Sequence, residues 1–324
     1  MNIGVIGVGH LGQHHVKHFS RLKQATLVGL HDRDHRRAEE VASKYQIQAF
    51  KELEALIAAC DALSIVTPTP THAIIAKRCL QAGKHVFIEK PITETVAEAD
   101  DLLRLAEQNQ VLIQVGHIER LNPALLPLKN YSLNPKYIEV QRLAPYNTRG
   151  TDVPVVLDLM IHDIDIILSL VQSPVKNIRA SGVSIMTRSV DIANARIRFE
   201  NGTVTSITSS RVAKDRVRKV KIFQREMYVT IDFLLGLTEV YRVLDAQAKD
   251  PQAIVTAPLE RNGIHRQIVY EKPPVKQVDA LQLELENFIQ ATQGFAPPIV
   301  DGQTGREALA VATKIHDLIL EDLD

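Results

Sequence analysis

The chain of 324 residues contains no tryptophan and only two cysteines, Cys60 and Cys79. Both lie in apolar stretches, and two thiols in a chain of this length do not suggest a fold held together by disulfides. We therefore expect a reducing, cytoplasmic environment. The N-terminus has no basic segment followed by an apolar segment, so we expect no secretory signal peptide.

Net charge and long hydrophobic runs are absent as well. Lys+Arg and Asp+Glu each number 38, so the formal net charge is zero. No overall basic field draws such a chain to nucleic acid or to an anionic membrane. The most apolar stretch, residues 155–171, contains Asp158, His162, Asp163 and Asp165, which argues against a membrane span. The expected partner is a small molecule, with no role for nucleic acid or membrane.

The first third of the chain alternates short β-branched runs with helical patterns. The expected strands are residues 3–6, 25–30, 62–66, 85–88 and 111–115, and the expected helices are residues 9–22, 33–45, 72–82 and 96–108. Each right-handed crossover between parallel strands uses a helix to return the chain. The alternation therefore predicts a doubly wound parallel sheet with helices on both faces.

The pattern changes after about Gly116. A long helix is expected over 155–171, and strands without helices between them are expected at 178–186, 193–199, 204–208, 217–223 and 227–233. Asn201-Gly202 predicts a tight hairpin, since both residues tolerate positive φ. Residues 247–275 are expected to form loops and an edge strand, and two helices near 279–292 and 302–320 close the chain. The pattern in this part of the chain predicts an α+β domain with a mostly antiparallel sheet.

The segment Gly7-Val8-Gly9-His10-Leu11-Gly12 follows the first expected strand and opens a helix. The first glycine permits a tight turn, the second lets the backbone approach a pyrophosphate, and the third allows close packing of helix and strand. The helix N-terminus offers N–H groups to the phosphates. Asp32 follows 20 residues after Gly12, where a carboxylate can bind the adenosine ribose. The pattern predicts a dinucleotide site; a bare strand–turn–helix is the alternative.

The choice of dinucleotide depends on two neighbouring residues. Asp32 favours NAD, because a carboxylate repels the 2′-phosphate of NADP. Arg33 could accept that phosphate, so NADP is not excluded. His10, His14 and His18 share a helical face, but no cysteine or carboxylate accompanies them, so we expect no metal site.

Two further groups suggest proton transfer. Glu89-Lys90-Pro91 ends an expected strand at the sheet edge where ligands bind, and a lysine there can exchange a proton with a substrate hydroxyl. Asp158 and His162 are four residues apart, so they share one helical face, and His162 could act as a general acid or base. The alternatives are a surface lysine before a turn proline, and a solvated or core Asp/His pair.

These motifs resemble the Gfo/Idh/MocA oxidoreductases in order and spacing over nearly the whole chain. The resemblance rests on the Gly7–Gly12 loop, Thr67-Pro68-Thr69-Pro70-Thr71-His72, Glu89-Lys90-Pro91 and Asp158-x-x-x-His162. It implies a dinucleotide-binding Rossmann domain at 1–118 and an open-faced sheet domain at 119–324 that binds substrate and makes a homodimer or homotetramer. It implies that Lys90, Asp158 and His162 are catalytic. It places against the cofactor Thr67, Pro68, Thr69, His72, Glu89 and Lys90. Met160 departs from the glycine that many members carry.

Within the family, residues 116–123 and 156–166 are most similar to nucleotide-sugar 3-dehydrogenases that act on UDP-N-acetylhexosamines. This resemblance implies that Arg120 and Asn122 line the substrate pocket, beside His117. A guanidinium suits a diphosphate, although a surface ion pair is an equal alternative for Arg120. Arg211 is a further candidate for the phosphates.

The expected reaction is hydride transfer between a nicotinamide and C3 of the sugar, with His162 or Lys90 taking the hydroxyl proton and Asp158 orienting the pair. Inositols, aldoses and dihydrodiols are alternative substrates. A dinucleotide sensor without catalytic activity is a further alternative.

Overall fold

The computed structural model describes residues 1–147, 153–248, 250–261 and 263–323. These residues form two compact units. The first contains Met1–Ile118 and Asp279–Ala310, and the second contains Glu119–Val278 and Val311–Asp324. The chain therefore does not divide at one point near residue 118, since Asp279–Ala310 belongs with the N-terminal residues.

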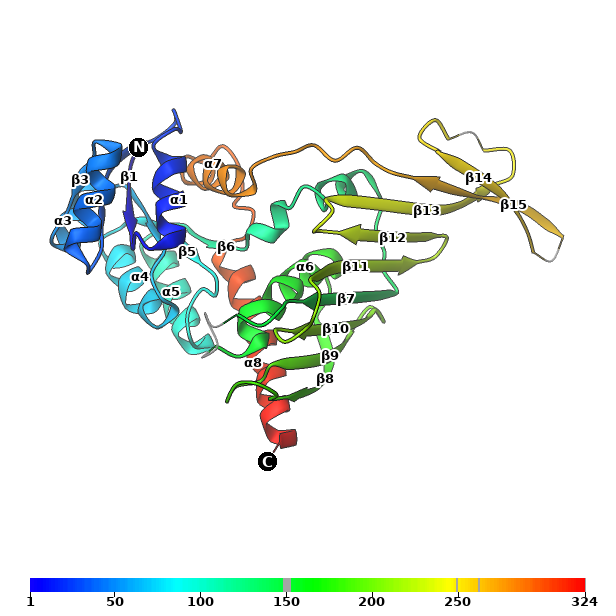
Figure 1. The fold of residues 1–324 in the computed structure, drawn as a ribbon. Coiled ribbons are helices and arrows are strands. Elements are labelled where there is room, and N and C mark those ends of the chain that lie inside the picture. Colours follow the sequence, from blue (N-terminus) through cyan, green and yellow to red (C-terminus); the bar gives the residue numbers. More distant parts are fainter. Residues whose placement is uncertain (148–152, 249, 262, 324) are drawn as a thin grey trace. The chain divides into compact units, whose positions relative to one another are not determined.

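The first unit is built on a six-stranded parallel sheet of order β3-β2-β1-β4-β5-β6 (Figure 1). The strands are β1 (Asn2–Ile6), β2 (Thr26–His31), β3 (Gln48–Ala49), β4 (Ala62–Ile65), β5 (His85–Glu89) and β6 (Ile113–Gly116). Central strands such as β4 are buried along their whole length, as is typical of a sheet covered on both faces. The predicted doubly wound parallel sheet is confirmed.

With one exception, the helices of this unit lie where the hydrophobic periodicity predicts them. They are α1 (His10–Phe19), α2 (His35–Tyr45), α3 (Leu53–Ala59), α4 (His72–Gln81), α5 (Val96–Gln108) and α7 (Ala280–Thr292). Thr95 caps α5 in a reciprocal capping box with Glu98, and Asp279 caps α7. The short elements β3 and α3 were not predicted, because neither is long enough to show a clear periodicity.

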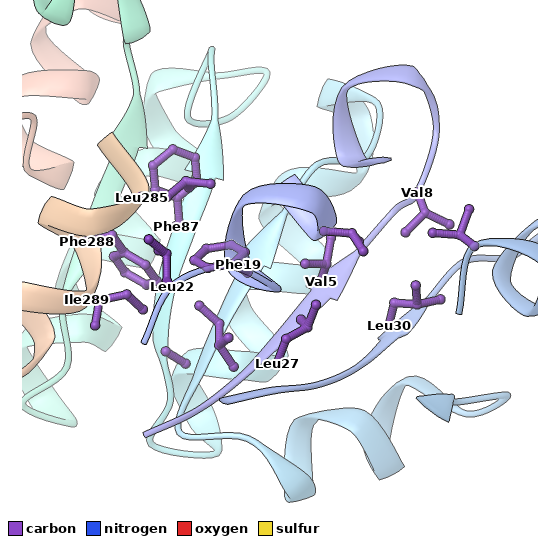
Figure 2. Packing of buried hydrophobic residues seen from close by; sticks show 14 of the residues in the cluster. Val5, Val8, Phe19, Leu22, Leu27, Leu30, Phe87, Leu285, Phe288 and Ile289 are labelled. Carbon is purple, nitrogen blue, oxygen red and sulfur yellow. The ribbon is translucent and has the colours of Figure 1, made fainter. Parts of the chain in front are cut away.

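Figure 2 shows why α7 belongs to the first unit. Leu285, Phe288 and Ile289 of α7 are buried in one cluster with Phe19 of α1 and Phe87 of β5. The rings of Phe87 and Phe288 meet edge to face with centroids 5.7 Å apart. Each such side chain contributes about 1.5–3 kcal/mol when fully buried. This burial ties a segment near the C-terminus to the N-terminal sheet.

The second unit contains a nine-stranded sheet of order β14-β15-β13-β12-β11-β7-β10-β9-β8 (Figure 1). Its strands are β7 (Tyr137–Leu143), β8 (Val175–Val183), β9 (Ile192–Phe199), β10 (Val204–Ser210), β11 (Val217–Gln224), β12 (Met227–Asp232), β13 (Leu237–Asp245), β14 (Val255–Arg261) and β15 (Ile264–Glu271). Only the β7–β10 pair is parallel among these described strands. Gly202, at φ 85°, forms the predicted turn between β9 and β10.

Three details of this unit differ from the expectations. Residues 255–271 form a two-stranded hairpin in place of one edge strand, and β7 and β13 were not predicted. In β7 the inward position 142 is an arginine, which breaks the apolar alternation. The helix expected over 155–171 begins as a π-helical turn, Val156–Met160, and continues as α6 (Ile161–Val171). The last helix, α8 (Gly302–Leu323), contributes its first residues to the first unit and the rest to the second.

Candidate active site and cofactor pocket

The glycine turn after β1 has the close contacts that the sequence predicts. Gly7 has φ 87°, and its N–H donates a hydrogen bond of 2.8 Å to the carbonyl oxygen of His31. A Cβ on Gly12 would lie only 1.9 Å from the Gly7 carbonyl oxygen. A Cβ on Gly9 would meet no described atom within 4 Å. Gly12 therefore serves helix packing, whereas Gly9 leaves the start of α1 accessible.

Asp32 fastens this turn to the end of β2. Its Oδ2 accepts a hydrogen bond of 2.8 Å from the N–H of Val8, and its Oδ1 accepts one of 2.9 Å from the N–H of Asp34. The Asp32 side chain is only 7% exposed, and Arg37 Nη1 lies 3.7 Å from its Oδ2. Arg37 also pairs with Asp34 at 2.9 Å. The carboxylate is thus held in place at the edge of the cofactor loop.

One pocket of about 580 Å³ gathers most of the residues expected to bind the cofactor. Those that line it are Gly7, Gly9, Leu11, Asp32, Arg33, Thr67, Pro68, Glu89 and Lys90. Further lining residues, which the motifs did not single out for the cofactor, are Ile6, His31, Arg37, Leu53, Val66, Pro70, Thr71, Ile75. Apolar side chains such as Leu53 and Ile75 carry no recognisable motif, so only their place in the fold reveals them.

The pocket fits a dinucleotide. Gly9 leaves room for a phosphate to approach, and in the described chain no side chain caps the N-terminus of α1. The first-turn N–H groups of a helix have no partners within the helix, and with the helix dipole they favour an anion. Asp32, which follows β2, and Lys90, which follows β5, line the same pocket, and they suit a ribose and a nicotinamide respectively.

Thr67, Thr69 and His72 lie where β4 leads into α4, and of these three residues Thr67 lines the pocket. Thr71 donates a hydrogen bond of 2.8 Å to Thr67, and Thr69 begins a short 3₁₀ turn that leads into α4. His72 is 1% exposed, and its ring nitrogens lie 2.8 Å from the carbonyl oxygen of Thr67 and 2.9 Å from that of Pro91. The imidazole therefore connects the Thr67 loop to the turn after β5. His10, Gly12, Thr69 and His72 do not line the pocket.

Asp158 and His162 lie on successive turns of one helix in the second unit. Asp158 is in the π-helical turn and His162 is in α6, and both are half-buried. Met160, between them, is fully buried and fills the core. Both side chains are thus partly exposed on the same helical segment.

Arg120 and Asn122 make contacts within the second unit. Arg120 donates from Nε and Nη2 to the two oxygens of Asp165, at 2.7 and 2.8 Å, and Asp165 is 1% exposed. The Asn122 amide donates to Glu119 at 3.1 Å, and its oxygen accepts from the N–H of Ala124. This bidentate pair anchors α6 to the segment that begins with residue 119, and it is more buried than the surface ion pair that the sequence left open.

A second buried ion pair lies beside the first. Arg142 of β7 donates to both oxygens of Asp163 at 2.8 and 2.9 Å, and Arg142 Nη1 lies 3.2 Å from Glu119. Burial acts to lower the pKa of Arg142, but the carboxylates of Asp163 and Glu119 outweigh it and raise that pKa. The guanidinium therefore stays charged. Sequence reasoning missed this residue, and the only available signal was an arginine at an inward position of a strand.

His117 and Arg211 are both buried, at 1% and 7% exposure. Arg211 follows β10 and donates a hydrogen bond to the carbonyl oxygen of Val153. His117 follows β6, and its backbone N–H donates a hydrogen bond of 2.9 Å to the carbonyl oxygen of Val115. The hydrogen bond from Arg211 holds the backbone at Val153, and the guanidinium also places a positive charge there.

Neither a metal site nor a membrane span is found in residues 1–147, 153–248, 250–261 and 263–323. No three side chains of His, Cys, Asp or Glu are grouped there so as to hold a metal ion. Every helix among these residues is too short or too polar to cross a lipid bilayer. Cys60 and Cys79 are buried free thiols, and burial raises the pKa of each to about 12.

Comparisons with known proteins agree with this geometry. The family profile described as "Oxidoreductase family, NAD-binding Rossmann fold" matches residues 1–117, and the profile "GFO/IDH/MocA C-terminal domain" matches residues 137–229. A UDP-N-acetylglucosamine 3-dehydrogenase of Acidithiobacillus ferrooxidans is 37% identical over 317 residues, which cover 98% of this chain and 96% of that protein. A myo-inositol 2-dehydrogenase of Thermotoga maritima is 26% identical over 328 residues, 95% of this chain and 93% of that protein.

A solved structure is similar over the full length. The structure of UDP-N-acetylglucosamine 3-dehydrogenase GnnA from Acidithiobacillus ferrooxidans matches with a TM-score of 0.89 and 35% identity, covering 100% of this chain and 99% of that chain. The expected two-part architecture and the NAD-binding character of the first unit are therefore confirmed.

Proposed function

The chain belongs to the Gfo/Idh/MocA oxidoreductase family, and we propose that it oxidises C3 of a UDP-N-acetylhexosamine, with UDP-N-acetylglucosamine as the first candidate. The observation that carries this proposal is one pocket lined by the glycine turn, Asp32, Glu89 and Lys90. Support for the substrate comes from the relative of 37% identity, whose name gives that sugar and that carbon.

NAD, when bound, supplies the hydride acceptor of this reaction. The residues of the chain bind the substrate, orient it and move the hydroxyl proton. We assign Lys90 and His162 to that proton and Asp158 to orienting them. A positioned acid or base typically contributes about 10²–10⁴-fold in rate. His162→Ala should therefore reduce kcat by about that factor while the chain still binds NAD.

We propose NAD over NADP on the geometry around Asp32. Its carboxylate is fixed by two backbone N–H groups at the pocket edge, where it would repel a 2′-phosphate. Arg37 is paired with Asp34, which leaves Arg33 as the residue that would favour the phosphate. The affinities for NADH and NADPH, measured by titration, decide between the two cofactors.

We assign different roles to the four residues expected to contact substrate. His117 and Asn122 are proposed to bind the sugar. Arg120 and Arg211 are proposed to act mainly by holding backbone and helix in place, because Arg120 is paired with Asp165 and Arg211 donates to a backbone carbonyl.

A ladder of aromatic rings supports a homodimer or homotetramer through the nine-stranded sheet. Adjacent ring centroids in this ladder are 4.7 to 5.9 Å apart. The rings come from five neighbouring strands and belong to Tyr137, Phe223, Tyr228, Tyr241 and Tyr270. Phe223 and Tyr241 are 37% and 36% exposed. Exposed apolar patches of this kind mark protein interfaces, so we propose that a second copy covers this face.

Free, unlinked cysteines fit a cytoplasmic location.

The experiment that tests the function is a substrate screen with NAD. UDP-sugars, free aldoses, dihydrodiols and inositols are each incubated with the protein, and NADH formation is followed by absorbance. We expect UDP-N-acetylglucosamine to give the highest kcat/KM. Turnover of an inositol alone would instead place the chain with its 26% identical relative, and tight NAD binding without any turnover would favour a sensor.

A further inference from the structure

A buried chain of polar side chains joins helix α1 to the end of β5. His15 of α1 is fully buried. Its Nδ1 lies 2.9 Å from the hydroxyl of Ser64 in β4, and its Nε2 lies 3.0 Å from Glu89 Oε1. Glu89 Oε2 in turn accepts a hydrogen bond of 3.3 Å from the backbone N–H of Lys90. Three elements of the first unit thus meet at the residue that precedes Lys90.

The chemistry of the two partners fixes the proton on this imidazole. An ionised carboxylate only accepts hydrogen bonds, so Nε2 must carry a proton and donate it to Glu89. In the neutral ring, Nδ1 then accepts from the Ser64 hydroxyl. Each link therefore has one donor and one acceptor, and fully satisfied buried networks of this kind are rigid.

The sheet leaves room for the Glu89 carboxylate on its other side. Gly116 of β6 is paired with Glu89, and a Cβ on Gly116 would lie 2.9 Å from Glu89 Oε2 and 3.0 Å from Glu89 Cδ. The ring of His15 packs edge to face on Phe87, with centroids 5.5 Å apart. The carboxylate therefore lies between the imidazole and a position where a Cβ would press on it.

Packing of α1 on the sheet does not by itself require a histidine at this position. The buried residues of α1 are Gly12, His15, Val16, His18 and Phe19, so apolar Val16 and Phe19 share the buried face with His15. An apolar side chain would satisfy the packing alone. The imidazole also makes a hydrogen bond to Glu89, which an apolar side chain could not make.

We propose that His15 is a positioning residue, which holds the Glu89 carboxylate and through it the backbone of Lys90 in the geometry needed for proton transfer. The inference rests on the proposed role of Lys90. Glu89 and Lys90 both line the cofactor pocket, so a displaced carboxylate would move the reacting amine relative to bound ligand. A misplacement of about 1 Å can cost about 10²-fold in rate.

The test compares two substitutions of His15 with a matched control. His15→Phe keeps the ring shape but removes the donor, whereas His15→Gln keeps an N–H near the position of Nε2. We expect His15→Phe to lower kcat by about 10–100-fold, with KM for the sugar and Kd for NAD changed by less than about threefold. We expect His15→Gln to restore most of kcat. His14→Phe makes the same change at an exposed site of α1 and should leave kcat near the original value.

A double-mutant cycle separates positioning from general destabilisation. In a Glu89→Ala background the imidazole has nothing to hold, so adding His15→Phe should change kcat by less than about twofold. Gly116→Ala pushes on the carboxylate with His15 intact, and it should lower kcat in the same way as His15→Phe. Independent losses in the double variant, or a lower Tm with unchanged kcat, would show that His15 is merely structural and overturn the inference.

A readout without turnover keeps this inference apart from the proposed function. In protein labelled with ¹⁵N-histidine, we expect His15 to appear as a ring protonated at Nε2 with a slowly exchanging proton, and that protection should disappear in Glu89→Ala. A neutral ring protonated only at Nδ1 would overturn the inference. Lack of activity of the unsubstituted protein on every UDP-sugar would instead refute the proposed function.

Discussion

Substituting alanine at two glycines of the same turn should affect different properties: thermal stability at Gly12 and NAD affinity at Gly9. A methyl group on Gly12 would lie 1.9 Å from the Gly7 carbonyl oxygen, far inside contact distance, so helix and turn must separate. Overpacking of this kind costs about 1–3 kcal/mol or more. A loss of about 3 kcal/mol lowers Tm by about 6–12 °C in a unit of this size. Gly12→Ala should therefore destabilise the protein.

Gly9→Ala makes the same chemical change where a Cβ would meet no described atom, at a φ of −63° that alanine readily adopts. The added methyl group would occupy the place where a pyrophosphate approaches the helix. We expect Tm to fall by about 2 °C at most, and the Kd for NAD to rise about tenfold or more, which corresponds to about 1.4 kcal/mol.

Differential scanning fluorimetry and isothermal titration with NAD measure the two effects separately. Gly9→Ala should be stable and weak in binding, whereas Gly12→Ala should be unstable. If Gly9→Ala bound NAD as tightly as the original chain, the phosphates could not lie over the glycine turn. An unchanged Tm in Gly12→Ala would contradict the close packing of α1 on β1.

Three further changes test other parts of the account. Asp32→Ser removes the charge that repels a 2′-phosphate, so the ratio of Kd values for NADPH and NADH should fall by about tenfold or more in a titration. Arg142→Met leaves the buried Asp163 carboxylate without its partner and should cost about 3–5 kcal/mol in urea unfolding. Burial alone raises the pKa of Asp191, but hydrogen bonds from residues 185–187 lower it from 3.8 to about 2. The lowered folded-state pKa stabilises the protein by about 2 kcal/mol above pH 4, and this contribution is lost as pH falls toward 2. Asp191→Asn should abolish that part of the pH dependence, and an unchanged acid profile would contradict it.

The first unit could be predicted well because its signals are local. The glycine turn, Asp32 and the Glu89-Lys90 strand end each follow from short motifs with a physical reason, and most of the predicted cofactor residues line one pocket. What the sequence does not reveal is the long-range packing. α7 is recognisable as a helix, but only its burial against Phe87 shows that it belongs to the N-terminal sheet.

Buried charges limited the prediction of the second unit. Arg120 has the right chemistry for a diphosphate, and nothing in the sequence shows that Asp165, 45 residues away, receives its guanidinium. Arg142 can occupy an inward position of β7, where the apolar alternation is broken, because the Asp163 carboxylate pairs with its guanidinium inside the unit. His15 was missed for the same reason, since its partners Ser64 and Glu89 are far away in the sequence.

The fate of a single hydrogen atom decides whether the chain transfers hydride from C3 of this sugar to NAD. UDP-N-acetylglucosamine that carries deuterium at C3 is incubated with the protein and NAD, and the reduced cofactor is analysed by mass spectrometry. We expect NADH that contains one deuterium, together with a 3-keto sugar nucleotide. Reduced cofactor without deuterium, or no reduction with this sugar while another substrate is turned over, would contradict it.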